Sequence, residues 1–219
     1  MADETKTVRV PAPANLRPFI LGRKVGMLQH FRADGSVVAA TVISAQANLV
    51  TQIRTKARDG YTAVQLGYGV VDPKRLAKGE RGHLKDLPAL KHLLEVRVDD
   101  VTGFETGQEV AVDRFVAGDK VDVVGVSKGK GFSGPVHLHH FQRGPTSHGS
   151  DHHRHQGSVG SGTTPGRILK GLRMAAHQGA DRVTVKNLEI LRADPERALL
   201  LIAGAVPGAR NGLVVVKKA

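Results

Sequence analysis

The hydrophobic pattern of the chain stops in the middle of the segment Val121-Asp-Val-Val-Gly-Val-Ser-Lys-Gly-Lys-Gly-Phe-Ser-Gly134. Residues 121–126 are rich in Val and read as a buried strand. Beyond Val126, large apolar residues become rare as far as Thr164, so this segment cannot build a core of its own. The sequence therefore predicts a strand that runs into a long loop.

Short apolar segments separated by turns occupy most of the remaining chain. Asp34-Gly35, between two such segments, is typical of a hairpin. Strands that recur at about 8–12 residue spacing favour a β-barrel or a β-sandwich. The expected strands lie at Phe19–Leu21, Met27–Phe31, Val37–Ser44, Leu49–Arg54, Tyr61–Gly67, Glu95–Val98, Glu109–Val112, Val121–Val126, Arg182–Leu191, Ala198–Ile202 and Gly212–Val216.

The predicted fold is mainly β, with segments of different composition near the N-terminus and in the middle of the body. Pro11, Pro13 and Pro18 oppose regular structure near the N-terminus. Ala89–Glu95 is expected to form one or two helical turns in a basic, proline-interrupted insertion, which makes that insertion a small α/β element. The expected parts are a flexible N-terminal extension (1–18), a globular body (19–126 and 165–219) with the insertion at about 72–95, and an extended central loop (127–164).

The charge of the chain indicates a polyanionic partner. There are 32 Lys and Arg against 20 Asp and Glu, a formal net charge of +12. Such an excess is self-repulsive unless an anion neutralises it, and nucleic acid is the usual neutraliser. No membrane is expected as a partner, because no apolar run reaches about 18 residues and no secretory signal is visible. The absence of Cys excludes disulfides and thiolate metal sites, so we expect a soluble, intracellular protein.

Residues 127–182 concentrate the groups that suit RNA. They contain eight Lys or Arg, eight of the eleven His and eleven of the 26 Gly, and only Asp151 and Asp181 are acidic. Glycines allow the backbone to approach a ligand, and cations neutralise phosphates. With only 6 Phe, 2 Tyr and no Trp, base stacking on aromatic residues is not expected to dominate. We interpret this segment as a loop that inserts into folded RNA, the alternative being a solvated basic linker.

Enzymatic interpretations of the same segment are weaker. Gly129–Gly134 matches the dinucleotide fingerprint G-x-G-x-x-G, but Pro135 and a Gly/His-rich loop follow instead of a helix. The histidines could supply Zn²⁺ ligands, but no H-E-x-x-H helix is present, and no serine lies in a nucleophile elbow. We therefore predict no catalytic residues, metal site, cofactor or small-molecule substrate. A metal- or nucleotide-dependent enzyme and a free RNA chaperone remain the alternatives.

A series of motifs, taken in order, resembles the bacterial family of large-subunit ribosomal protein three over about residues 19–216. Each motif is weak alone, and the ordered series is specific. The most specific is Ser127–Gly134. The others include Leu21–Met27, His148-Gly149, His153-Arg154, Gly157–Gly160, Thr164–Arg167, Asp181–Val185 and Gly204–Gly208.

The resemblance implies more than composition does. It implies a closed β-barrel body and a structural, non-enzymatic constituent of the large (50S) ribosomal subunit. It further implies binding to 23S rRNA near its 3′ end, nucleation of subunit assembly, and a loop that reaches toward the peptidyl transferase centre. Large-subunit proteins fourteen and nineteen would be neighbours, and the location would be the cytoplasm, on the ribosome.

The resemblance and the charge pattern together nominate rRNA-binding residues. Two departures from the family pattern are Leu138, where a basic residue is usual, and Thr163, where some bacterial members carry a methylated Gln. Arg23 and Lys24 form a separate basic pair that could equally be a solvated turn. The nominated residues are Arg23, Lys24, Lys128, Lys130, Arg143, His148, His153, Arg154, Arg167, Lys170 and Arg173.

Overall fold

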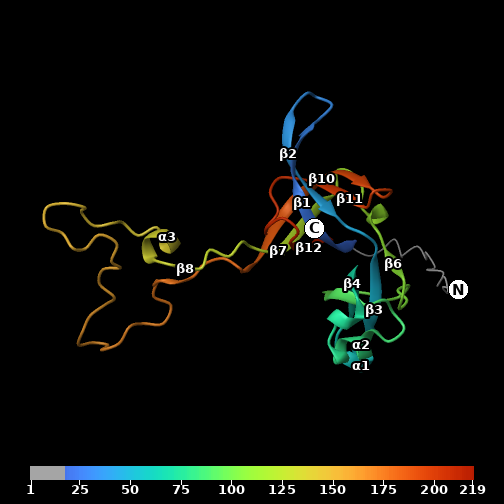
Figure 1. Ribbon diagram of the computed structural model, residues 1–219, viewed down its shortest axis with the longest axis horizontal. Helices are drawn as coiled ribbons and strands as arrows, with labels where there is room; N and C mark the ends of the chain where they lie inside the picture. Colours follow the sequence, from blue (N-terminus) through green and yellow to red (C-terminus); the bar gives the residue numbers. More distant parts are fainter. Residues whose placement is uncertain (1–17) are drawn as a thin grey trace. The chain divides into compact units, whose positions relative to one another are not determined.

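The computed structural model describes residues 18–219, so the expected extension at 1–18 lies almost entirely outside the described part (Figure 1). The described chain is mainly β, as predicted, and divides into two units. The first contains the chain up to Val126 together with Arg182–Ala219, and the second is Ser127–Asp181. Residues 165–181, which were expected in the body, belong to the second unit.

Six antiparallel strands of the first unit form a closed barrel. Each strand pairs with two neighbours, so no edge of this sheet is left open. In barrel order the strands are β1 (Phe19–Phe31), β12 (Leu213–Lys218), β7 (Lys120–Val126), β10 (Arg182–Asp194), β11 (Leu199–Ala203) and β2 (Val37–Ser44).

The barrel interior is filled by branched aliphatic side chains. In β7, Val121 and Val123 are fully buried, while Asp122 between them is partly exposed, which is the alternation expected of a strand with one buried face. Burying each such Val or Ile contributes about 1.5–3 kcal/mol. The interior includes Ile20, Ile43, Val121, Val123, Ile190, Leu200, Ile202, Val214 and Val216.

Strands β1 and β2 continue past the barrel as a hairpin, drawn in blue in Figure 1. Its turn contains Asp34 and Gly35, as the Asp-Gly pattern predicts, and Gly35 adopts φ +81°. Both the N–H and the hydroxyl of Ser36 donate hydrogen bonds to Asp34 Oδ1. These local contacts explain why sequence alone located this turn.

Four other strands of the first unit form a separate antiparallel sheet. Their order is β5 (Leu90–Arg97), β4 (Ala63–Val70), β3 (Asn48–Arg54) and β6 (Glu109–Val110). Their core includes Phe19 and Leu21 of β1, while Ile20 lies in the barrel core. The run Phe19–Leu21 is continuously apolar because β1 is covered on both faces at this point.

The helices of the first unit are short and lie in its loops. The first two are α1 (Lys56–Asp59) and the 3-10 turn η1 (Pro73–Arg75). The others are α2 (Lys78–Leu84) and the 3-10 turn η2 (Val112–Arg114).

The helical turns expected at Ala89–Glu95 are wrong, because Leu90–Arg97 is strand β5. An isolated helix of seven residues is too short to be stable by itself. Pairing with β4 gives the backbone of this edge strand hydrogen-bond partners on one side, and Leu90 is buried with Leu76 and Leu84. The helix of the insertion lies earlier, at α2.

The second unit has little regular structure. Strand β8 (Phe132–Ser133) pairs with β9 (Ala176–His177), and helix α3 (Pro135–His139) follows β8. Between α3 and β9 the chain runs as an extended loop (Figure 1). Only Ser133 and Pro135 are buried in the whole unit. The unit thus contains almost no apolar core.

Candidate nucleic-acid interface

The basic side chains of the second unit are exposed and free of carboxylate partners. Lys128, Lys130, Arg143 and Arg154 are all in the exposed class. Within the described part of the chain, every ion pair joins residues of the first unit. The cations of Ser127–Asp181 therefore present their charge to the solvent, where a phosphate could bind them.

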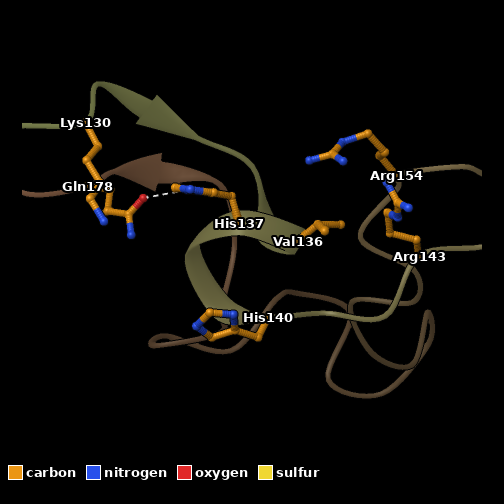
Figure 2. A pocket seen from close by; sticks show the side chains of 7 residues that line it. All are labelled: Lys130, Val136, His137, His140, Arg143, Arg154 and Gln178. Atoms are coloured by element: carbon orange, nitrogen blue, oxygen red, sulfur yellow. Dashed lines mark hydrogen bonds between the residues drawn. The ribbon is translucent and has the colours of Figure 1, made fainter.

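An open pocket lies among these cations. Its volume is about 460 Å³, and no acidic residue lines it. Figure 2 shows the side chains around it. The lining residues are Lys130, Val136, His137, His140, Arg143, Arg154 and Gln178.

Backbone pairing near β8 and β9 brings Lys130 and Gln178 together. The Lys130 N–H donates to the Gln178 carbonyl at 2.8 Å, and the Gln178 N–H donates to the Gly131 carbonyl at 2.9 Å. Across the pocket wall, Nδ1 of His137 lies 2.8 Å from Oε1 of Gln178 (Figure 2). Since an amide oxygen only accepts, Nδ1 of His137 donates this hydrogen bond.

The two arginines of the pocket are placed by a tight contact in the loop. The Gly144 N–H donates to the His153 carbonyl at 3.2 Å, which joins the residues next to Arg143 and Arg154. A Cβ at position 144 would collide with the carbonyl oxygen of His152. Only glycine therefore fits at position 144 without moving the loop.

Two nominated histidines differ in their surroundings. Nδ1 of the His153 ring lies 2.9 Å from the Pro145 carbonyl oxygen. This contact stabilises the loop next to the pocket. His148 is exposed at φ +59° and does not line the pocket.

The remaining cations nominated in this unit lie outside the pocket. Arg167, Lys170 and Arg173 are exposed, and the Arg173 carbonyl accepts a 3.0 Å hydrogen bond from Nε2 of Gln156. The structure therefore gathers Lys130, Arg143 and Arg154 and leaves the others dispersed along the loop.

Comparison with known proteins gives this arrangement a family. The family model described as Ribosomal protein L3 matches residues 92–198. A protein of Herpetosiphon aurantiacus named large ribosomal subunit protein uL3 is 52% identical over 202 residues, covering 91% of this chain and 95% of the relative. Proteins of the same name from Synechococcus sp. strain JA-3-3Ab and Acidothermus cellulolyticus are each 50% identical, covering 91% of this chain and 95% and 91% of their own lengths.

The chain belongs to the uL3 family of large ribosomal subunit proteins. This family is structural and non-enzymatic, so the enzymatic alternatives are set aside. A bacterial uL3 protein is cytoplasmic and ribosome-bound.

Arg23 and Lys24, nominated from their charge and their uL3 motif, are engaged inside the first unit. The Lys24 ammonium donates to the Val206 carbonyl at 2.7 Å and to the Gly208 carbonyl at 3.1 Å. The guanidinium of Arg23 lies 5.8 Å from the ring centroid of Tyr68, within cation–π range. Both contacts favour structural roles within the first unit. For Lys24 in particular, this differs from the rRNA-binding role nominated from the sequence.

Four pocket residues of this uL3 chain were missed as RNA-binding candidates. His137 and His140 were considered only among the histidines that could supply metal ligands, and Val136 and Gln178 carried no local signal. Within residues 18–219 no group of three or more His, Asp or Glu is placed to hold a metal ion. In the same part of the chain, no helix has the length and apolar character needed to cross a membrane.

Proposed function

We propose that the second unit, Ser127–Asp181, is the principal binding surface of this uL3 chain for large-subunit (23S) rRNA. The observation that carries the proposal is the set of exposed, carboxylate-free cations on a segment that has almost no core. A segment of this kind gains stability from an anionic partner rather than from its own packing.

The chemistry of the unit supports recognition of RNA shape and backbone. Lys and Arg side chains neutralise phosphates, and glycine-rich backbone leaves N–H groups accessible to phosphate oxygens. Phe132 and Phe141 are its only Phe, Tyr or Trp residues, so a stacking platform for single-stranded RNA is not built here. Contacts to the rRNA backbone and to its 2′-hydroxyls would then supply most of the affinity.

The finer placement rests on the ordered motifs that resemble the family. We propose that residues 127–164 reach toward the peptidyl transferase centre, with the barrel body at the subunit surface. The chain would bind near the 3′ end of the rRNA, nucleate subunit assembly, and neighbour large-subunit proteins fourteen and nineteen. The long extended segment between α3 and β9 supports the penetrating role, because it could follow a channel between RNA helices.

Sedimentation tests this proposal against a free RNA chaperone. Cell extract containing tagged full-length chain is separated on a sucrose gradient. We expect the chain to co-migrate with large subunits and to remain with them after a high-salt wash. Absence from the large-subunit fractions would contradict the ribosomal role.

A further inference from the structure

The pocket of the second unit is too large for a single phosphate group. At about 460 Å³ it falls in the range of about 300–1,000 Å³ that is usual for small organic ligands. A lone phosphate held by two arginines would leave most of it empty. A ligand that fills the pocket would carry an additional, less polar part.

The pocket has cationic residues at both ends and Val136 between them. In Figure 2 the Arg143 and Arg154 side chains lie on one side of Val136, and Lys130 with Gln178 lies on the other. Val136 is the apolar contact between them. A ligand that matches this order has a charged group at each end and a flat, partly apolar body between them.

The middle of the pocket also offers hydrogen-bonding groups. Because Gln178 Oε1 accepts from His137 Nδ1, the Gln178 amide nitrogen is left to donate and the outer ring nitrogen of His137 is left to bond a ligand. These two groups can pair with a ring that has hydrogen-bonding atoms at its edge. Nucleobases have such edges, and their faces can rest on Val136 or on an imidazole ring.

We propose that this pocket holds one unpaired nucleotide of the rRNA, with its base over Val136 and its flanking phosphates at Arg143/Arg154 and at Lys130. The proposal rests on the proposed function and sharpens it, because it places a single extruded nucleotide at a defined position in the loop. It differs from general phosphate neutralisation, in which the charges along the loop would be interchangeable.

The test uses two variants of the full chain that lose the same charge. R143Q/R154Q removes both pocket guanidinium groups. R167Q/K170Q removes two exposed cations of the same unit that do not line the pocket. Each variant is bound to an in vitro transcript of bacterial 23S rRNA, and the 2′-hydroxyl reactivity of every nucleotide is measured alongside the overall affinity.

We expect the wild-type protein to change the reactivity of one or two unpaired nucleotides. R143Q/R154Q should lose that change and lose about tenfold more affinity than R167Q/K170Q, since it removes charge-assisted contacts to one site. R167Q/K170Q should keep the change. Equal affinity losses with the local change kept in both variants would overturn the pocket and leave the proposed function intact.

A third variant separates base contact from charge. V136N removes the apolar surface of the pocket without changing its charge, and V159N makes the same substitution at an exposed Val outside it. V136N should abolish the local reactivity change at unaltered salt dependence, and V159N should have no effect. A V136N protein that retains the change contradicts the proposed base contact. If the wild-type protein did not bind the 23S rRNA transcript, both the proposed function and the proposed nucleotide site would be contradicted.

Discussion

Asn48 satisfies both backbone polar groups of Leu21, 27 positions earlier in the chain. The Leu21 N–H donates to Asn48 Oδ1 at 2.7 Å, and Asn48 Nδ2 donates to the Leu21 carbonyl at 3.0 Å. Pairing of β1 with β2 begins only at Arg23, so Leu21 has no ladder neighbour on that side. The fully buried side-chain amide of Asn48 thus gives Leu21 the two hydrogen bonds that a neighbouring strand would otherwise provide.

Replacing Asn48 by Ala should destabilise the first unit strongly. Two buried backbone groups would lose their partners, at a cost of about 2–4 kcal/mol in the free energy of unfolding. Gln46→Ala is the control, because that side chain is exposed and only its backbone carbonyl contacts Asn48. Urea unfolding measures both variants, and equal stabilities would show that the Asn48–Leu21 contact is not needed.

Lys24→Met should impair folding stability more than RNA binding. The substitution removes donors from the Val206 and Gly208 carbonyls, which we expect to lower the free energy of unfolding by about 1–2 kcal/mol. Lys186→Met, at an exposed position of β10, is the matched control for the lost charge. If the Lys24 variant kept full stability but lost rRNA affinity, the role first inferred from sequence would be correct.

Local patterns of the sequence predicted those features that depend on neighbouring residues. The Asp34-Gly35 turn and the end of apolar patterning at Val126 are of this kind. The second sheet and strand β5 escaped prediction, because pairing between distant segments determined them. Alternating apolar residues show that a strand has a buried face, and they do not show which sheet it joins.

In the candidate site, too, local features were predictable and contacts between distant residues were not. Composition located the basic, Gly- and His-rich segment, because charge needs no partner to be visible. The pocket depends on contacts such as His137 with Gln178, which are 41 positions apart, and no spacing pattern marks them. Lys24 shows what composition cannot reveal, since its ammonium, counted in sequence only as a charge, donates to backbone carbonyls within the fold.

Gly144→Ala should disturb the pocket without affecting the barrel. The new methyl group would collide with the His152 carbonyl oxygen and so move Arg143 relative to Arg154. We expect weaker rRNA binding at an unchanged unfolding temperature, because this unit contributes little core. Gly162→Ala, where a methyl group meets no atom within 4 Å, is the control. Equal rRNA affinity of the two variants would show that the loop tolerates the displacement.

The carboxylate of Asp119 should make the barrel sensitive to acid. Its hydrogen bond to Lys218 Nζ at 2.7 Å is the main cause that lowers the pKa of Asp119 below its ordinary value of 3.8. A depressed pKa in the folded state contributes stability above the unfolded value, and that contribution is lost as the pH falls through the folded pKa.

Thermal unfolding between about pH 2 and pH 6 measures this contribution. Asp119→Asn should be less stable than the wild type near pH 6, and the difference should shrink below about pH 3. Asp151→Asn, at an exposed position of the second unit, serves as control. A difference that stays constant across this pH range would contradict the ion-pair explanation.

The second unit should be dispensable for folding of the first. Ser127 and Asp181 lie together, with the Ser127 N–H donating to the Asp181 carbonyl at 2.8 Å, so two glycines can replace residues 128–180. All three buried hydrophobic clusters of the first unit remain complete in this deletion variant. Differential scanning calorimetry should show a cooperative transition close to that of the full chain, and its loss would mean that the core had been misplaced.

The RNA-binding role of Ser127–Asp181 is tested by measuring how the full chain and this deletion variant bind 23S rRNA across a salt series. With about 6–10 phosphates neutralised, the full chain should give a slope of log K against log salt of roughly −4 to −9. The deletion variant should bind much more weakly and with a much shallower slope. If both proteins bound with the same affinity and the same slope, Ser127–Asp181 would not be the RNA-binding unit.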